Sequence, residues 1–315
     1  MALRLVTVFG GSGFIGRNLV GRLAKAGYRV NVAVRRAEQA KFLKPLGDVG
    51  QITPVPASLR DPASIARAVA GAWAVVNLVG ILHESGRQRF HAIHAEGARQ
   101  AALAAKAAGA QRFVQVSAIG ADPASPAAYA RSKAAGEAAV RAVFPEATIL
   151  RPSLVFGPDD GLFNRFAAMA RLAPALPLIG GGHTRFQPVY VGDVADAIMA
   201  ALAGPGGGTY ELGGPEVVTF REILELMMHH TGIRRPLVPV PWWVARLKGA
   251  MLQCLPSPPL TLDQVRMLER DNVVAPGAKG LADLGITPTP MAVVLPGYLE
   301  RFRPGGRFSP KGQAA

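Results

Sequence analysis

The sequence has few cysteines, few acidic residues and no long apolar run. Its single cysteine, Cys254, excludes an internal disulfide and a cysteine metal cluster, which fits a reducing compartment. The apolar neighbours Leu252 and Leu255 predict that Cys254 is a buried small hydrophobe rather than a nucleophile. No run reaches the roughly 18 to 20 apolar residues of a transmembrane helix. The first predicted strand begins almost at once, so we expect no signal peptide and a cytoplasmic location.

Basic residues outnumber acidic ones: the chain has 35 Lys and Arg residues and 21 Asp and Glu residues. Its net charge is therefore +14. Such an excess indicates an acidic partner, an anionic membrane surface or a phosphorylated ligand. The sequence lacks a zinc spacing, a basic-aromatic RNA motif and a helix-turn-helix signal, so we expect no nucleic acid as partner. Its 315 residues, 50% of them hydrophobic, suffice for one large α/β domain with a subdomain or for two small domains.

The most informative motif is a glycine-rich turn near the start of the chain. Gly10, Gly13 and Gly16 follow an apolar run at 5–9 and open a helical pattern over 17–26. Glycines at this spacing allow a tight turn, close approach of the backbone to a pyrophosphate and close packing of helix on strand. The helix N-terminus offers N–H groups and a positive dipole end to phosphates. This context favours a dinucleotide site over an ordinary glycine-rich turn.

The next predicted strand, 28–34, leads into two arginines, Arg35 and Arg36. They lie about 20 residues beyond the glycines, where an NAD-binding fold places an acidic residue on the ribose hydroxyls. Two guanidinium groups can instead bind a 2′-phosphate through paired hydrogen bonds. The pair therefore favours NADPH over NADH as cofactor. A basic surface loop is the alternative interpretation.

Strands and helical patterns alternate through the first half of the chain. Asp61 and Pro62 begin one helix, as N-cap and first helical residue, and a long alanine-rich helix is predicted over 90–108. This alternation predicts a Rossmann-type doubly wound α/β fold with a parallel sheet. The predicted strands after 28–34 are 52–55, 74–80 and 112–117.

The sequence predicts three divisions of the chain. They are a dinucleotide-binding core at 1–155, a smaller, loop-rich C-terminal portion at 156–300 that interleaves with the last sheet elements, and a basic tail at 301–315.

The second half is rich in proline and less regular. An amphipathic helix is predicted over 220–231, and 239–255 form an apolar segment dotted with basic residues. That segment fits core, a partner-docking face or a membrane-surface helix. Core or partner packing is favoured, because the adjacent Trp242 and Trp243 face different ways on a helix. The tail, which carries Phe302 and Phe308 among arginines, fits either a disordered end or a docking segment.

A second motif carries candidate chemistry. Tyr129 and Lys133 lie four residues apart, so they share one face of a predicted helix. A nearby ammonium lowers the pKa of a phenol, and the lysine can also bind a nicotinamide ribose. Ser117 ends the preceding strand, at the carboxyl edge where α/β sites form. The serine would orient a carbonyl, the tyrosine would donate a proton, and a cofactor would supply hydride.

Together these motifs resemble the extended or atypical branch of the short-chain dehydrogenase/reductase superfamily. The resemblance spans residues 1 to about 215 and includes the segments Asn77–Gly80, Arg151–Gly157 and Tyr190–Ala195. It implies catalytic roles for Ser117, Tyr129 and Lys133. It implies cofactor contacts at Gly10, Gly13, Phe14, Ile15, Arg35, Arg36, Asp61, Leu78, Tyr129, Lys133 and Pro152.

A narrower resemblance is to the NADPH-binding accessory subunits of respiratory complex I, in their bacterial form. Phe144–Ala147, Phe163–Phe166, Pro177–Gly180 and Gln187–Val191 carry it. It implies a non-catalytic subunit that holds NADPH, docks on core subunits of the hydrophilic arm and supports that peripheral arm of the NADH:quinone oxidoreductase. The catalytic trio would then be vestigial. The resemblance implies a peripheral position at the cytoplasmic face of the inner membrane, with the C-terminal third a candidate for membrane-surface contact.

Two other functions stay open. A free NADPH-dependent reductase or epimerase acting on a carbonyl compound or sugar nucleotide would explain why the whole trio is present. A redox-sensing regulator of the same superfamily is less well supported, because such proteins often lack the catalytic tyrosine.

Three histidines, His83, His91 and His94, lie close together in the sequence. His94 stands where many extended reductases have an asparagine that supports a proton relay, so the resemblance does not extend to that relay. His83, His91 and His94 lack an associated acidic cluster, and we therefore expect no metal site.

Overall fold

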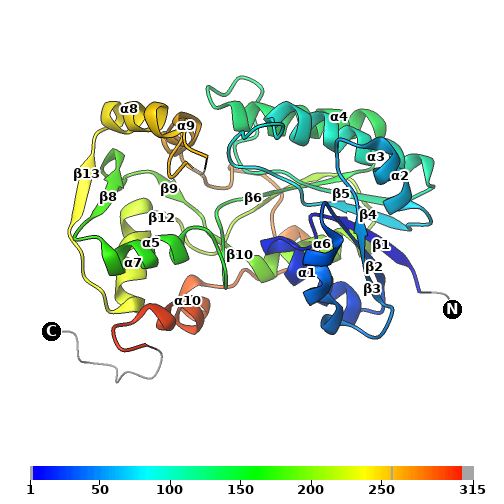
Figure 1. The fold of residues 1–315 in the computed structure, drawn as a ribbon, viewed down its shortest axis with the longest axis horizontal. Helices are drawn as coiled ribbons and strands as arrows, with labels where there is room; N and C mark the ends of the chain where they lie inside the picture. Colours follow the sequence, from blue (N-terminus) through cyan, green and yellow to red (C-terminus); the bar gives the residue numbers. More distant parts are fainter. Residues whose placement is uncertain (1–2, 257, 307–315) are drawn as a thin grey trace. The chain divides into compact units, whose positions relative to one another are not determined.

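The computed structural model describes residues 3–256 and 258–306, and Figure 1 shows its elements. The chain divides into two compact units. Unit 1 comprises Met1–Pro152, Val191–Leu212 and Ala275–Thr287, and unit 2 comprises Ser153–Tyr190, Gly213–Val274 and Pro288–Ala315. Residues 307–315 of the predicted basic tail, including Phe308, lie outside the described residues.

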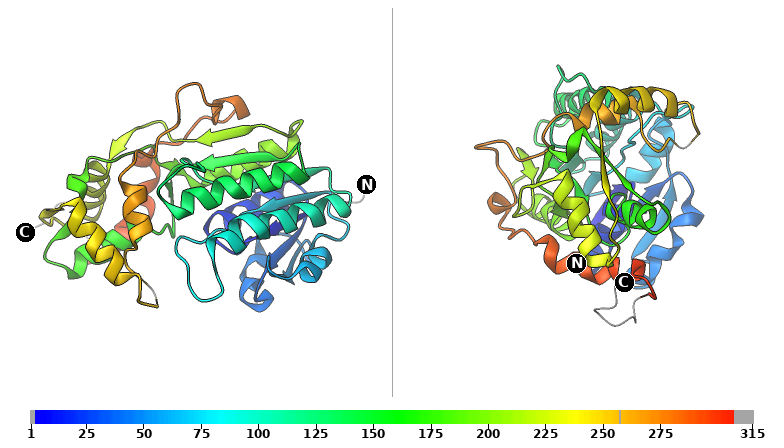
Figure 2. Two further views of the ribbon diagram at one scale, coloured as in Figure 1. Left: turned by 90° about the horizontal axis from the view of Figure 1, so that it is seen from above. Right: turned by 90° about the vertical axis from the view of Figure 1, so that its left-hand side faces the viewer.

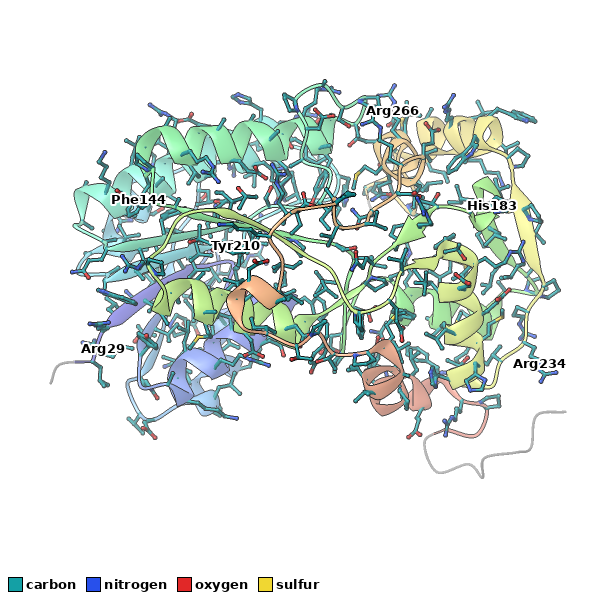
Figure 3. All side chains as sticks on the ribbon, turned by 180° about the vertical axis from the view of Figure 1, so that it is seen from behind. Arg29, Phe144, His183, Tyr210, Arg234 and Arg266 are labelled. Atoms are coloured by element: carbon teal, nitrogen blue, oxygen red, sulfur yellow. The ribbon has the colours of Figure 1, made fainter. Side chains whose placement is uncertain are left out.

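Unit 1 is built on a seven-stranded sheet of order β11-β6-β5-β4-β1-β2-β3, in which every neighbouring pair is parallel. The strands are β1 (Leu5–Phe9), β2 (Arg29–Val34), β3 (Ile52–Pro56), β4 (Ala74–Asn77), β5 (Arg112–Val116), β6 (Thr148–Pro152) and β11 (Thr209–Leu212). Tyr210, labelled in Figure 3, marks β11 at one edge. This order confirms the Rossmann-type doubly wound fold. It also places the topological switch point between β1 and β4, where ligands bind in such sheets.

Helices cover both faces of this sheet (Figure 1). On one face α1 (Phe14–Lys25) packs against α6 (Val191–Ala203). On the other face α2 (Pro62–Val69), α3 (Gly97–Ala107) and α4 (Ala128–Val143) pack in succession, and Figure 2 shows α3 and α4 side by side. Small residues of α3, among them Ala98, Ala101 and Ala105, are fully buried and allow this close packing. The helix predicted over 90–108 is present, but its first turn, His91–Glu96, is a π-helix.

Unit 2 contains three two-stranded pairs and five α-helices within its described residues. The pairs are β7 (Val155–Phe156) with β10 (Val189–Tyr190), β9 (Arg185–Phe186) with β12 (Val218–Thr219), and β8 (Leu176–Ile179) with β13 (Leu237–Val240). The helices are α5 (Phe163–Leu172), α7 (Phe220–Thr231), α8 (Trp242–Leu252), α9 (Leu262–Leu268) and α10 (Met291–Leu299). Aromatic and aliphatic side chains of α5, α7 and α10 share one core. The helix predicted over 220–231 is confirmed, with a capping box at Thr219 and Glu222 and a left-handed Gly232 at its end.

Helix α8 packs on the rest of unit 2 through a narrow face. Its buried residues are Ala245 and Gly249, and α8 packs on α9 so closely that a Cβ on Gly249 would lie 2.9 Å from the backbone N of Leu262. Trp243, Leu247 and Met251 of α8 are exposed, and Cys254 just beyond the helix is exposed as well. The prediction of a buried cysteine was therefore wrong. In the described ranges, no helix has both the length and the apolar character needed to cross a membrane.

Candidate dinucleotide site

The glycine-rich turn lies at the carboxyl end of β1, beside the switch point. Gly10 has a φ of +78°, which a residue with a side chain rarely adopts, and its N–H donates to Ala33 O at 3.1 Å. Gly16 sits against the turn itself, since a Cβ there would lie 2.5 Å from Gly10 O. Gly10 and Gly16 therefore have to be glycine, the first for its φ and the second because no Cβ fits.

The N-terminus of α1 opens from this turn. Gly13 is its N-cap residue, and no side chain in the described part of the chain caps it. The backbone N–H groups of Phe14 and Ile15 belong to the first helical turn, which has no intrahelical acceptor for them. An uncapped N-terminus with its positive dipole end is suited to an anion such as a pyrophosphate.

Arg35 and Arg36 follow β2 at the same edge of the sheet. Both are exposed, and neither forms an ion pair with any residue that the structure describes. Asp61 has the capping role that the sequence predicts. Its carboxylate accepts a hydrogen bond from Ala63 N at 3.1 Å and caps α2, as its position before Pro62 predicts. Its cofactor contact stays a prediction.

Three further predicted residues end or follow neighbouring strands. Leu78 follows β4, and its N–H donates to Phe9 O at 3.0 Å across the switch point. Pro152 ends β6, and its carbonyl accepts from Ile119 N at 3.1 Å. Ser117 follows β5, and its Oγ is a buried polar atom without a hydrogen-bond partner among the described residues. A buried hydroxyl of this kind has an unmet requirement for a partner, which a bound ligand can supply.

Tyr129 and Lys133 lie on the buried face of α4. The Lys133 Nζ lies 5.8 Å from the centre of the Tyr129 ring and donates to Val116 O at 3.4 Å, next to Ser117. Burial raises the pKa of Tyr129 to about 12, and burial lowers the pKa of Lys133 to about 8 against the opposing charge of Glu137. The predicted lowering of the tyrosine pKa by the ammonium was therefore wrong for the chain alone, because desolvation dominates.

His94 was noted in the sequence as a departure, not as a site residue, yet it lies at the centre of this group. It is 2% exposed, and its ring contacts the rings of Phe90 and Tyr129, each at 5.5 Å between centres. Its Nε2 lies 2.9 Å from Ile81 N and its Nδ1 lies 2.8 Å from Ser132 Oγ. Burial first, and the Lys133 charge second, lower the pKa of His94 to about 3.

A charge network lies one helical turn along α4 from Lys133. Arg151 forms paired hydrogen bonds with Glu137, at 2.9 and 2.7 Å, and a further bond with Glu211 at 3.4 Å. Glu211 also accepts from Ala275 N at 2.9 Å. Sequence reasoning missed this network, although the spacing of Glu137 four residues after Lys133 was a signal that it shares the lysine's helix face.

The geometry fits a nicotinamide dinucleotide at the carboxyl edge of the sheet. The fit rests on the left-handed Gly10, the uncapped α1 N-terminus and the unpartnered Ser117 hydroxyl. The glycine-rich turn would hold the pyrophosphate, and Tyr129 with Lys133 would hold the nicotinamide ribose. Such a cofactor supplies hydride chemistry. No group of three or more His, Cys, Asp or Glu side chains within residues 3–256 and 258–306 is arranged to hold a metal ion.

Comparison with known proteins places the chain in a family. Residues 6–213 match the NAD dependent epimerase/dehydratase family. The chain belongs to this family. Among solved structures, UDP-glucose 4-epimerase of Thermus thermophilus in complex with NAD is 22% identical, with a TM-score of 0.70 over 95% of this chain and 98% of that one. UDP-glucose 4-epimerase of Thermotoga maritima with UDP-glucose has a TM-score of 0.72 at 19% identity, over 95% and 98% of the two chains. At these identities the likeness shows the fold alone.

Closer relatives come from respiratory chains. The chain is 40% identical to "NADH dehydrogenase [ubiquinone] 1 alpha subcomplex subunit 9, mitochondrial" of Arabidopsis thaliana, over 96% of this chain and 79% of the relative. It is 34% identical to the "NADH-ubiquinone oxidoreductase 40 kDa subunit, mitochondrial" of Neurospora crassa, over 94% and 79%. A ceramide reductase of Caulobacter vibrioides is 35% identical, over 75% of this chain and 74% of that protein.

Proposed function

We propose that this chain is an accessory subunit of the proton-pumping NADH:quinone oxidoreductase that holds NADPH and turns over no substrate. The observation that carries the proposal is the extent of the match. Relatives named as subunits of NADH dehydrogenase or NADH-ubiquinone oxidoreductase align with 94–97% of the chain, whereas the ceramide reductase aligns with 75%. The likeness to respiratory subunits therefore includes most of unit 2 as well as the dinucleotide site.

The preference for NADPH is supported by Arg35 and Arg36. Both follow β2, both are exposed, and both are without an ion-pair partner in the described part of the chain. Their guanidinium groups are therefore available to a 2′-phosphate, which carries a charge that a ribose hydroxyl lacks. The contacts proposed for the remainder of the cofactor are Gly10, Gly13, Phe14, Ile15, Asp61, Leu78, Tyr129, Lys133 and Pro152.

A holding role is supported by the protonation of the trio. A tyrosine with a pKa of about 12 keeps its proton at neutral pH, so it serves as a hydrogen-bond donor. Lys133 and Ser117 add a second donor and a buried hydroxyl. These groups suit a ribose and a carboxamide that are bound and retained. A bound cofactor would stabilise the chain because it binds only the folded state.

Docking near the membrane is supported by one face of α8 and the turn that follows it. Trp243, Leu247, Met251 and Leu255 follow each other at four-residue spacing and are 69%, 55%, 68% and 49% exposed. We call these four side chains the α8 stripe. The 37 residues from 226 to 262 contain no Asp or Glu but contain Arg234, Arg235, Arg246 and Lys248, and the Arg234 side chain projects outward in Figure 3. An apolar stripe with cationic neighbours suits the core subunits of the hydrophilic arm or the anionic cytoplasmic face of the inner membrane.

The experiment that tests this function is fractionation of native membranes. Membranes extracted with a mild detergent are separated by native electrophoresis, and an antibody locates the chain. Comigration with NADH:quinone oxidoreductase activity in a large complex is the expected result. A small soluble species that lacks this activity would overturn the proposal.

A free reductase is the second candidate, and the intact trio favours it. Ser117, Tyr129 and Lys133 would suffice for reduction of a carbonyl, and the Caulobacter relative carries the name of a reductase. The substrate would be a carbonyl compound or a sugar nucleotide. NADPH consumption by the purified chain with a panel of such compounds, and its loss in Tyr129→Phe, would establish this alternative.

A further inference from the structure

We propose that His94 is a positioning residue that clamps the turn after β4 onto helix α4 and thereby slows the release of NADPH. The clamp consists of the imidazole and its two hydrogen bonds. This inference deepens the proposed function and rests on it for the identity of the cofactor.

The two bonds of His94 define its protonation. Ile81 N–H is a donor, so Nε2, at 2.9 Å, must accept with its lone pair. The single proton of the neutral ring therefore resides on Nδ1, which donates to Ser132 Oγ at 2.8 Å. Ser132 in turn donates to the backbone carbonyl of Tyr129 at 2.7 Å. One continuous chain of bonds thus runs from the turn at residues 80–81 to the first turn of α4.

The clamp lies directly beside Lys133. A Cβ placed on Gly80 would lie 3.2 Å from Lys133 Nζ and 3.7 Å from His94 Nε2, so both nitrogens face this glycine. The Nε2 lone pair is already occupied by Ile81, so His94 cannot take a proton from Lys133 without breaking that bond. The imidazole therefore supports the geometry around Lys133 and carries no proton away from it.

Packing makes the clamp rigid. His94 is stacked on Phe90 and meets the Tyr129 ring edge-on, and a Cβ on Gly136 would lie 2.1 Å from His94 O. Helix α4 and the π-helical turn of His94 are thus in direct backbone contact. Movement of the turn at residues 80–81 requires loss of both side-chain bonds and of this packing. Because Lys133 and Tyr129 are proposed to hold the cofactor ribose, a fixed turn beside them retards its departure.

The two nitrogens can be tested separately with amide isosteres. A glutamine amide reaches the position of Nε2 and an asparagine amide reaches that of Nδ1, so His94→Gln keeps the Ile81 contact and His94→Asn loses it. NADPH release from the full chain is measured by displacement with excess NADP⁺, followed by cofactor fluorescence. We expect release to be roughly tenfold faster in His94→Asn, which loses the bond to the turn at residues 80–81, and to increase less in His94→Gln, which keeps that bond but loses the one to Ser132. The control is His91→Asn, an exposed histidine of the same helical turn, which should not differ from wild type.

A second measurement on the cofactor-free wild-type chain keeps the test independent of the variants. Imidazole nitrogen NMR should show His94 neutral, with its proton on Nδ1, at every pH from 8 down to 5. A proton on Nε2, a charged ring at pH 6.5, or equal release rates in His94→Asn and wild type would overturn the inference. If the wild-type chain retains no NADPH, the proposed function fails, and the NMR result then decides alone whether the clamp exists.

Discussion

Gly80 and Lys133 are in near contact, because a Cβ atom on Gly80 would lie 3.2 Å from the lysine Nζ. Gly80 does not have a positive φ, so its backbone tolerates alanine. The added methyl group would instead crowd the Lys133 side chain. We predict that Gly80→Ala displaces the ammonium and weakens NADPH binding about fivefold, with little change in thermal stability. Isothermal titration and thermal unfolding check this. Gly21→Ala in α1 is the control, since its Cβ would make an ordinary 3.8 Å contact with Leu46 Cδ1 and should leave NADPH affinity unchanged.

Cofactor choice is predicted to depend on Arg35 and Arg36. The double change to alanine should weaken NADPH binding by roughly 10- to 100-fold, because two charge-assisted hydrogen bonds to the 2′-phosphate are lost. NADH binding should change less than about twofold. Titration with both cofactors measures the difference, with Arg67→Ala, an exposed arginine of α2, as control. Equal losses for the two cofactors would show that the arginines do not read the 2′-phosphate.

Much of unit 1 follows from local patterns. The strand at 5–9, the glycine turn and the helix after it combine apolar runs with backbone positions that only glycine accepts, so they are predictable. The roles of His94 and Arg151 are harder to predict from local patterns. Each is defined by partners from distant segments, such as Ile81 with Ser132 and Glu137 with Glu211, and no local spacing reveals both partners. The outward face of α8 was also unpredictable, since an apolar sequence alone does not tell whether its partner lies within the chain.

The ion pair of Glu137 and Arg151 is predicted to support unit 1. Glu137→Gln removes one charge of a pair in which the glutamate side chain is 8% exposed, so the unfolding free energy should fall by about 2–3 kcal/mol. Urea unfolding of the chain without cofactor gives this value. The matched control is Glu96→Gln, which breaks an exposed pair with Arg99 and should cost less than about 0.5 kcal/mol. Equal effects would mean that the buried network adds no stability.

Stability in acid should depend on His94. Its pKa is about 3 in the folded chain against an ordinary histidine value of 6.5, so below pH 6.5 the unfolded chain binds a proton that the folded chain does not. This contribution is complete above pH 6.5 and is lost as the pH falls toward 3, at up to about 1.4 kcal/mol per pH unit. His94→Gln should therefore lose less stability than wild type between pH 7 and pH 5 in urea unfolding. His91→Gln should follow wild type, and identical slopes in all three proteins would contradict the neutral buried state.

The α8 stripe is predicted to serve attachment rather than folding. Trp243→Ser combined with Met251→Ser should leave thermal unfolding within about 2 °C of wild type, because both side chains are mostly exposed. The same pair should reduce the fraction of the chain that stays with membranes after a salt wash. Leu172→Ser, a 90% exposed leucine of α5, is the control. Unchanged retention in the double variant would show that another surface attaches the chain.

The central claim is that the chain holds NADPH within the NADH:quinone oxidoreductase, and nucleotide analysis of the isolated complex tests it most directly. The complex is purified from native membranes, denatured, and assayed for NADP(H), NAD(H) and copies of this chain. We predict about one NADP(H) per copy of the chain in the wild-type complex. In the double variant Arg35→Ala, Arg36→Ala we predict that the complex keeps the chain but loses the nucleotide. A complex that contains the chain without NADP(H), or a chain found only outside the complex, would contradict it.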